Sequence, residues 1–243
     1  MAVDHFTGWI AERYDESAAE TFVPAVVDPV VDLLTDLAGT GAALELGIGT
    51  GRIALPLSAR GTSVHGIDLS SDMVAQLRVK PGAERIPVAM GDFAATSVDE
   101  TFALACLVFN TIMNLTTQEE QVACFRNVAR HLEPGERFVV EVGVPDLRRL
   151  PPGETARPFL VSPTRLGFDE YDVAQQRLVP HHHVLTDGQW RATSIPFRYV
   201  WPAELDLMAR LAGMELEARW GGWDRQPFTA ESRAHVSVWR KPG

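Results

Sequence analysis

Three glycines at alternate positions constrain the fold of this chain more than any other feature of its sequence. Gly47, Gly49 and Gly51 follow a short apolar run. A second apolar run ends at Asp68, about 20 residues further on, where a carboxylate that binds a ribose is expected. Glycines after a strand allow a tight turn and a close approach of a ligand to the backbone, and the next helix points its N-terminus at that ligand. The loop and the acid together predict a site for an adenosine-containing cofactor.

Apolar runs and helical patterns alternate around this loop. The apolar runs predict strands at 42–46, 63–67, 86–90, 102–109 and 137–142. The stretches between them carry helix signals, including a capping box at Thr116–Glu119 or Thr117–Glu120 before a helix that runs to about 132. Strands that alternate with helices are typical of a parallel sheet covered on both faces. The sequence therefore predicts an α/β fold of the Rossmann-like kind.

The alternation stops after Pro145. Residues 151–200 contain strand-like segments without a good helical pattern, and Asp187-Gly188 is a strong signal for a hairpin turn. The alternation of helices and strands resumes with a predicted helix at 203–211 and predicted strands at 214–220 and 234–239. We therefore expect an N-terminal helical lid at 1–40, a core formed by 41–150 and 201–243, and an inserted antiparallel β subdomain at 151–200.

The composition limits the partners of this chain. Its 243 residues, 46% of them hydrophobic, support one large domain with a full core. The 32 acidic and 22 basic residues give a net charge of −10 without a basic cluster, which disfavours nucleic acids and anionic membranes as partners. Cys106 and Cys124 lack metal-ligand spacing, so we expect no metal. Without a signal-peptide core or a run of about 20 apolar residues, a soluble cytoplasmic protein is expected.

The spacing of the glycines distinguishes between cofactors. The dinucleotide fingerprint G-x-G-x-x-G would place its last glycine at Arg52, whereas this sequence has E-L-G-I-G-T-G-R. That stretch resembles motif I of the class I S-adenosylmethionine-dependent methyltransferases, (E/D)-x-G-x-G-x-G. "HGIDLS", "GDF" and "LVFNTIMNL" resemble motifs II, III and IV in the family's order, and "RHLEPGERFVVEV" resembles the helix-turn-strand that follows. The resemblance covers nearly the whole chain and implies a mostly parallel seven-stranded sheet with helices on both faces.

The same resemblance implies S-adenosylmethionine as cofactor, S-adenosylhomocysteine as product, and a set of binding residues. Glu45 and the loop of Gly47, Gly49 and Gly51 would hold the methionine end, and Asp68 would bind the ribose. The resemblance further implies that Leu69 and Met73 flank the adenine, that Asp92 accepts from its amino group beside Phe93, and that Phe109 and Asn110 border the methyl group. Tyr14, in the segment "AERYDES", would close over the cofactor.

Methyl transfer from a sulfonium is an in-line displacement, in which the protein mainly aligns the reacting atoms. An amine acceptor needs little beyond the loss of a proton, whereas a phenol or alcohol needs a positioned base. The candidates for catalytic residues are Glu141, near the end of a strand on the ligand-bearing edge, Tyr14 in the lid, and His181; His5 is a further candidate base. Successive side chains of a strand alternate between its faces, so the run His181–His183 does not converge on one metal ion.

The position of the insertion, after the fifth strand, resembles amino-sugar and lincosamide N-methyltransferases of natural-product pathways. In those proteins it helps to form the acceptor pocket and a dimer interface. The resemblance implies methylation of an amine nitrogen of an amino sugar or related metabolite, and it leaves a homodimer open. O-methylation of a secondary metabolite and cofactor binding without transferase activity stay open as alternatives. The glycine spacing disfavours a nicotinamide-dependent dehydrogenase, and "FNTI" in place of N-P-P-Y disfavours nucleic-acid methylation.

Overall fold

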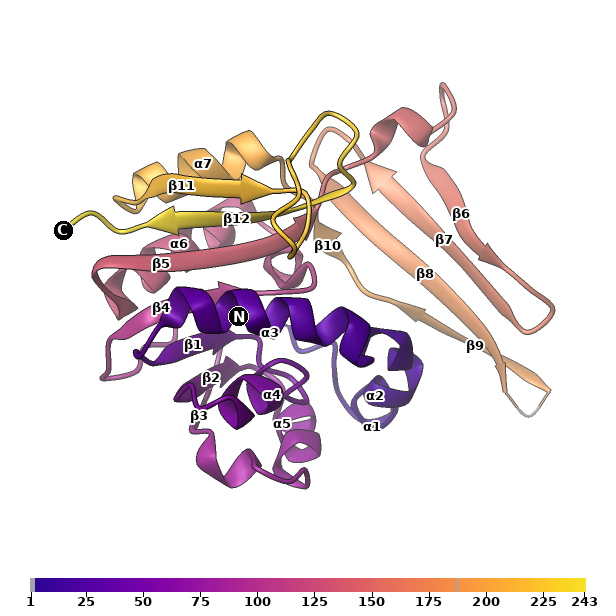
Figure 1. Cartoon of the computed structure of the whole chain (residues 1–243). Helices are drawn as coiled ribbons and strands as arrows, with labels where there is room; N and C mark the ends of the chain where they lie inside the picture. The colour runs from indigo at the N-terminus through magenta and orange to yellow at the C-terminus, as the bar shows by residue number, and fades with distance from the viewer. Residues whose placement is uncertain (1–2, 187) are drawn as a thin grey trace.

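A seven-stranded sheet forms the centre of the molecule (Figure 1). The computed structural model describes residues 3–186 and 188–243. The strand order is β11-β12-β5-β4-β1-β2-β3. The strands are β1 (Ala43–Leu46), β2 (Val64–Asp68), β3 (Val88–Met90), β4 (Phe102–Leu107), β5 (Leu132–Gly143), β11 (Glu215–Trp220) and β12 (Ala234–Arg240). The first five strands pair in parallel, and β12 pairs antiparallel with β5 and β11, which confirms the predicted mostly parallel sheet.

The winding of the chain reverses at β1. This strand pairs with β2 on one side, where Leu46 lies opposite Ile67, and with β4 on the other, where Glu45 lies opposite Cys106. The chain runs outward from β1 to β3 and then crosses back to β4. In open α/β sheets, ligands bind beyond the carboxyl ends of the strands at such a reversal. The glycine loop after β1, the end of β2 and the turn after β4 therefore meet at one crevice.

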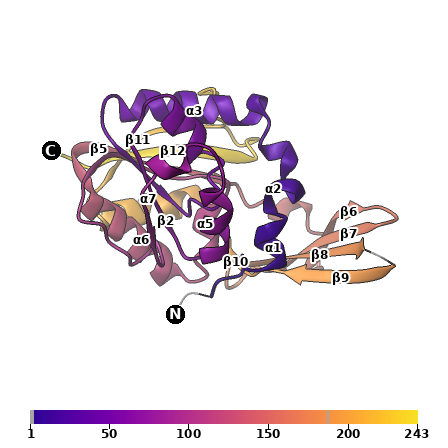
Figure 2. The same cartoon turned by 90° about the horizontal axis from the view of Figure 1, so that it is seen from below.

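Helices cover both faces of this sheet (Figure 2). On one face, α3 (Pro24–Ala38) and α4 (Ala54–Ala59) bury apolar side chains such as Leu34 and Leu57 against the strands. On the other face, α6 (Gln118–His131) and α7 (Pro202–Leu211) do the same with Phe125 and Met208. Both faces of β1 are covered, so all of its residues are buried. This explains why its sequence is a continuous apolar run interrupted only by Glu45.

α6 and α5 (Ser71–Arg78) begin at residues whose side chains cap them. The capping box of α6 uses Thr117 and Glu120, with both reciprocal hydrogen bonds present at 3.0 and 3.1 Å. α5 begins after Ser70, whose hydroxyl accepts from the N–H of Met73. The shorter helices are α1 (Trp9–Glu12), α2 (Tyr14–Ser17) and the 3-10 turns η1 (Ala19–Thr21), η2 (Ala83–Arg85), η3 (Thr111–Asn114) and η4 (Leu147–Arg149). Within residues 3–186 and 188–243, no helix has the length and apolar character needed to cross a membrane.

A second, antiparallel sheet lies beside the end of the main sheet at which β5 finishes (Figure 1). Its strands are β6 (Ala156–Val161), β7 (Arg165–Asp172), β8 (Arg177–Thr186), β9 (Gln189–Ser194) and β10 (Phe197–Arg198). β8 pairs with β7, β9 and β10, and β6 pairs with β7. The predicted inserted antiparallel sheet is therefore confirmed. The Asp187-Gly188 turn was predicted between β8 and β9, and Asp187 lies outside the described residues.

Candidate active site

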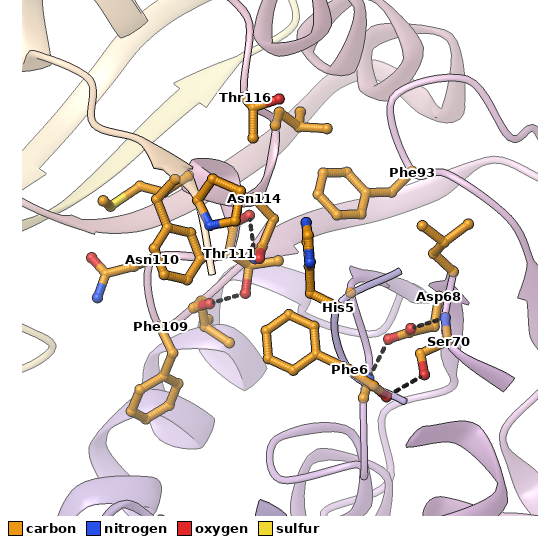
Figure 3. Close-up of a pocket in the computed structure, with 18 of the residues that line it drawn as sticks. His5, Phe6, Asp68, Ser70, Phe93, Phe109, Asn110, Thr111, Asn114 and Thr116 are labelled. Carbon is orange, nitrogen blue, oxygen red and sulfur yellow. Dashed lines mark hydrogen bonds between the residues drawn. The ribbon is translucent and has the colours of Figure 1, made fainter. Parts of the chain in front are cut away.

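A cavity of about 790 Å³ lies at the carboxyl edge of the main sheet. Figure 3 shows that its walls come from segments far apart in the sequence. One side is formed by the glycine loop, the ends of β2 and β3 and the turn after β4. The other side is formed by the start of the segment after β5 and by the inserted sheet. Residues 3–6 of the N-terminal segment complete the wall.

Two of the three glycines of the loop line the cavity. Gly47 and Gly49 have φ values of 67° and 53°, in the left-handed region that favours glycine. A Cβ atom at Gly47 would lie 2.6 Å from Cγ2 of Thr111, so a side chain there would collide with the opposite wall. Gly51 lies outside the wall, and a Cβ atom on it would lie 2.4 Å from Cδ1 of Leu77 in α5. Gly47 and Gly49 therefore leave room for a ligand, whereas Gly51 lets the loop pack against a helix.

Asp68 lies at the end of β2 and faces the cavity (Figure 3). One carboxylate oxygen accepts from the N–H of Gly49 at 2.6 Å, and the other accepts from the N–H of Ser70 at 2.8 Å. Burial raises the pKa of this carboxyl above its usual range, and the two backbone donors oppose that rise. Each carboxylate oxygen has about two acceptor positions, so both oxygens keep capacity for hydroxyl groups of a ligand.

The residues predicted around an adenine line one region of the cavity wall. Leu69 and Met73, at and after the end of β2, present apolar surface. Asp92 follows β3 and also lines the cavity, while one of its oxygens accepts from the N–H of Ala94 at 2.8 Å. It therefore caps a local turn and faces the cavity at the same time. Phe93, next to it, is 8% exposed and its ring points into the cavity.

Glu45 is a buried acid at the centre of the site. It belongs to β1, is 3% exposed and lines the cavity. Burial raises its pKa from 4.5 to about 8, although the guanidinium of Arg52 nearby opposes the rise. Among the described residues, its Oε2 atom has no hydrogen-bond partner. Tyr14 of α2 lines the same cavity, and its ring meets that of Phe6 edge to face, with centroids 6.1 Å apart.

The turn after β4 is tighter than predicted. β4 ends at Leu107, two residues before the predicted end, because Phe109 and Asn110 adopt φ values of 54° and 62°. The side chain of Asn110 accepts from the N–H of Gly143 at 2.6 Å, and the N–H of Phe109 donates to Oε2 of Glu141 at 2.9 Å. Phe109 and Asn110 both line the cavity. The partly buried Glu141, whose pKa is raised by desolvation, lies behind this turn and outside the described wall of the cavity.

His181 also lies outside the described wall. Its ring nitrogens lie 2.8 Å from Oγ of Ser194 and 3.0 Å from Oε2 of Glu170, and its ring stacks on that of Phe168. The preceding residue, Pro180, does line the cavity. Adjacent side chains of a strand point to opposite faces, so His181 points away from the cavity. Within residues 3–186 and 188–243, no group of three or more histidines, cysteines or acids is placed to hold a metal ion.

The N-terminal segment 3–8 enters the site more deeply than the sequence indicated. The carbonyl oxygen of Phe6 accepts from Oγ of Ser70 at 2.7 Å, and the N–H of Gly8 donates to Asp72 at 2.6 Å. These bonds fix the segment over the end of β2. The side chains of His5 and Phe6 point into the cavity, with His5 directed away from Asp68 (Figure 3). A histidine and an aromatic residue close to Tyr14 were the only signals for this in the sequence.

The inserted sheet adds apolar and aromatic side chains that sequence analysis mostly missed. Leu178, Pro180, Pro196, Phe197 and Tyr199 line the cavity together with Tyr171. Tyr171 and Leu178 lie opposite each other in β7 and β8, on the same face as Pro180. Which face of an antiparallel sheet is turned inward depends on how the whole sheet is placed. A half-polar strand sequence such as "RLVPHHHVL" does not encode that placement.

Comparison with known proteins identifies the family. Residues 43–135 match the family model described as "Methyltransferase domain". The CcbJ methyltransferase from Streptomyces caelestis is 36% identical to this chain, and its structure superposes with a TM-score of 0.86 over 96% of each chain. The chain belongs to the class I S-adenosylmethionine-dependent methyltransferases. This membership confirms the predicted enzyme class and cofactor, and a nicotinamide-dependent dehydrogenase is no longer an alternative.

Two further relatives of this methyltransferase are more distant. The cypemycin N-terminal methyltransferase of a Streptomyces species is 28% identical over 241 residues, which cover 93% of this chain and 96% of that protein. CalS10 is described as an amino pentose methyltransferase from Micromonospora echinaspora involved in calicheamicin biosynthesis. It is 21% identical, with a TM-score of 0.70 over 98% of this chain and 99% of CalS10, and its structure contains S-adenosylmethionine. At that identity the likeness shows the fold.

The residues of this methyltransferase fit S-adenosylmethionine, which supplies an activated methyl group on a sulfonium centre. Oε2 of Glu45, which has no partner among the described residues, would accept from the ammonium group of the methionine moiety. Asp68 keeps acceptor capacity for the ribose hydroxyls. Leu69, Met73 and Phe93 offer apolar surface to a purine ring. The roles of these individual residues remain predictions.

Proposed function

We propose that this methyltransferase methylates an amine nitrogen of a small molecule, an amino sugar or a related natural-product metabolite. The observation that carries the proposal is the aromatic wall of the acceptor side of the cavity. Tyr171, Phe197 and Tyr199 of the second sheet and its connection to α7 line the same cavity as Glu45 and Asp68. When a neutral amine takes a methyl group, positive charge develops on its nitrogen. Aromatic faces attract such a charge by about 0.5–2 kcal/mol.

The names of two relatives support an amine. One is called an N-terminal methyltransferase, and the other is described as acting on an amino pentose. The cavity of about 790 Å³ must hold a cofactor and an acceptor together, which favours a small acceptor. Tyr171 of the wall is better suited to contact with the acceptor than to proton transfer. Burial raises the pKa of Tyr171 to about 12, so its hydroxyl stays protonated at neutral pH.

We assign the proton-accepting role to His5. Among the described residues that line the cavity, it is the one imidazole. Its ring points into the cavity from a segment held by the Phe6–Ser70 and Gly8–Asp72 hydrogen bonds (Figure 3). Imidazole is suited to general base catalysis near neutral pH. In this scheme His5 takes the proton that the acceptor nitrogen loses, while Glu141 holds the turn that carries Phe109 and acts as a positioning residue.

The same base supports O-methylation as the second candidate. A phenol or alcohol acceptor needs a base more than an amine does, and His5 would supply one. A panel of amino sugars, other amines and phenols, each incubated with S-adenosylmethionine, separates the two. We expect S-adenosylhomocysteine to form with an amine, together with a product heavier by one methyl group on nitrogen. Methylation of phenols alone would overturn the amine proposal, and no turnover with any acceptor of the panel would overturn both.

We further propose that this methyltransferase forms a homodimer through the second sheet. Val161 and Leu166 lie opposite each other in β6 and β7, and they are 76% and 39% exposed. Trp190 of β9 is 49% exposed. Large exposed apolar side chains on neighbouring strands are typical of contact surfaces. Light scattering after size exclusion should give the mass of a dimer for the wild type and of a monomer for Val161→Glu with Leu166→Glu; a wild-type monomer would contradict the proposal.

A further inference from the structure

Arg198 is a buried cation between two residues of the aromatic wall. Phe197 and Tyr199 line the cavity, whereas Arg198 lies outside the described wall and is 6% exposed. Successive side chains of a strand point to opposite faces, so the side chain of Arg198 is directed away from the cavity. A buried charge is costly unless it is paired and hydrogen-bonded. The partners of this guanidinium therefore decide how β10 is held.

The guanidinium of Arg198 bonds to two helices of the main sheet. Its Nη2 atom donates to Oε1 of Glu204 in α7 at 2.7 Å, and its Nη1 atom donates to Oε1 of Gln121 in α6 at 2.5 Å. The side chains of Arg198 and Glu204 are 7% and 14% exposed, so the ion pair is largely shielded from solvent. β10 of the second sheet is thereby fastened to α6 and α7.

Gln121 extends this network to a second part of the cavity wall. It is 0% exposed, and its Nε2 atom lies 3.2–3.3 Å from the carbonyl oxygens of Ile112, Leu115 and Arg198. Ile112 belongs to η3, and η3 and Leu115 both contribute to the cavity wall. One buried amide therefore bonds to η3 and to β10 together.

Gln176 ties the turn between β7 and β8 to the same ion pair. Its Nε2 atom donates to Oε2 of Glu204 at 2.8 Å and to the carbonyl oxygen of Tyr199 at 3.0 Å. Its Oε1 atom accepts from Nη2 of Arg198 at 3.2 Å. The parts of the second sheet that carry the aromatic wall are thus joined to η3 through one set of buried side chains.

We propose that Arg198 is a positioning residue for methyl transfer. Through Gln121 and Glu204 it sets the aromatic wall against η3, and so fixes the acceptor relative to the methyl group. An in-line transfer needs this, because a misplacement of about 1 Å can lower the rate by about 100-fold. A fully satisfied buried network specifies one arrangement of the segments that it joins. The inference rests on the proposed acceptor site and holds for an amine or a hydroxyl acceptor alike.

Replacing both charges separates positioning from stability. Arg198→Met with Glu204→Met keeps most of the side-chain volume, and apolar replacement of a buried ion pair is often neutral or stabilising. We expect the double variant to keep the wild-type Tm and the wild-type Kd for S-adenosylhomocysteine. Its kcat/KM for the acceptor of the panel that turns over fastest should fall by about 10- to 100-fold. Arg198→Lys keeps the charge without the planar fork and should recover part of this loss.

A second buried ion pair provides a matched control. Arg219 of β11 and Asp206 of α7 lie 2.7 Å apart, and both are outside the described cavity wall. Arg219→Met with Asp206→Met should retain the wild-type kcat/KM. An unchanged kcat/KM in the Arg198 and Glu204 double variant, or an equal loss in this control, would overturn the proposal. If the double variant does not fold, Gln121→Met leaves the ion pair in place and takes the same test.

Hydrogen exchange supplies a readout that needs no acceptor. With S-adenosylhomocysteine bound, the segments 111–116 and 195–201 of the double variant should exchange about 10-fold faster than in the wild type. Exchange in β1 and β2 should not change. Wild-type exchange in the two segments would overturn the proposal. If no acceptor of the panel is methylated, the proposed function fails, and the exchange measurement still decides whether Arg198 positions these segments.

Discussion

At the scale of single residues, Asp68 connects two segments at the carboxyl edge of the main sheet. Its two carboxylate oxygens accept from Gly49 in the glycine loop and from Ser70 at the start of α5. The same side chain lines the cavity. One acid therefore shapes the loop, and we predict that it also presents acceptors to a ribose.

Replacing Asp68 should weaken cofactor binding. Asp68→Ala removes the acceptors for the ribose hydroxyls, so we expect the Kd for S-adenosylhomocysteine to rise by about 10- to 100-fold. Titration calorimetry measures this directly. The matched control is Asp99→Ala, which removes an exposed acid outside the described cavity wall. Equal affinities of Asp68→Ala and wild type would remove the ribose assignment.

Glu45 should make the stability of the ligand-free protein depend on pH. Its pKa is raised from 4.5 to about 8 in the folded state, so between these values the folded protein keeps a proton that the unfolded chain has lost. Stability from this group is therefore greatest below about 4.5 and is lost as the pH rises through about 8. Thermal unfolding should show a larger fall in Tm from about pH 6 to about pH 9 for the wild type than for Glu45→Gln.

The comparison isolates Glu45 from the other acids whose pKa values are raised. Asp68 and Glu141 also have raised pKa values, and they contribute to the wild type and the Glu45→Gln variant alike. Glu84→Gln, which changes an exposed glutamate, should follow the wild type. Identical pH dependence of Glu45→Gln and wild type would show that Glu45 is already ionised in the folded protein.

At the scale of elements, the glycine loop combines a ligand-facing part and a packing part. Gly47 and Gly49 face the cavity, whereas Gly51 lies against Leu77 of α5 and Leu55 of α4. The loop therefore depends on the helices beneath it. A change at its last glycine should affect folding before it affects ligand contact.

Gly51→Ala should destabilise the fold through two effects. Its φ of 82° disfavours a side chain by about 1–2 kcal/mol, and the new Cβ would overlap Leu77, which typically adds about 1–3 kcal/mol. Gly61→Ala is a matched control, because φ there is 95° and nothing lies within 4 Å of the new atom. Urea unfolding should give a larger loss for Gly51→Ala than for Gly61→Ala. Equal losses would show that the loop relaxes away from α5.

Most of the helices and strands, and the residues at the carboxyl edge of the main sheet, could be predicted from the sequence because the sequence signals for them are local. Each of these signals concerns only a few neighbouring residues: the apolar run before Gly47 predicts a strand, Asp68 marks the end of the next strand, and the capping box at Thr117 marks the start of a helix. The tight turn at Phe109 was missed because nothing in its apolar sequence marks a positive φ. Glu141 and His181 were predicted as catalytic from their strands, but the direction of a strand side chain depends on tertiary placement. The entry of His5 into the cavity depends on contacts with Ser70 and Asp72, which are remote in sequence.

At the scale of the whole molecule, we assign the cofactor to the main sheet and the acceptor to the second sheet. The main sheet supplies the residues assigned to the cofactor, and the second sheet with its connection to α7 supplies most of the aromatic wall assigned to the acceptor. The N-terminal segment 3–8 lies where the two parts meet. Changes in one sheet should therefore leave the binding step of the other intact.

Phe197→Ala should weaken binding of the acceptor without weakening binding of the cofactor. Loss of one aromatic face next to a developing cation is expected to raise the acceptor KM by about 3- to 30-fold. The Kd for S-adenosylhomocysteine should stay at the wild-type value. Steady-state kinetics with an acceptor from the panel, together with calorimetry, separates the two quantities. Phe159→Ala, in the same sheet but outside the described cavity wall, is the control. A parallel loss of cofactor affinity in Phe197→Ala would contradict this division.

The most direct test of the account is a crystal structure of the protein with S-adenosylhomocysteine bound. We expect electron density across the carboxyl edge of the main sheet, with the ribose hydroxyls on Asp68 and the adenine beside Leu69 and Phe93. The methionine tail should lie beside Glu45 and the glycine loop. Density for the ligand at another place, or this crevice without ligand at saturating concentration, would contradict the central claim.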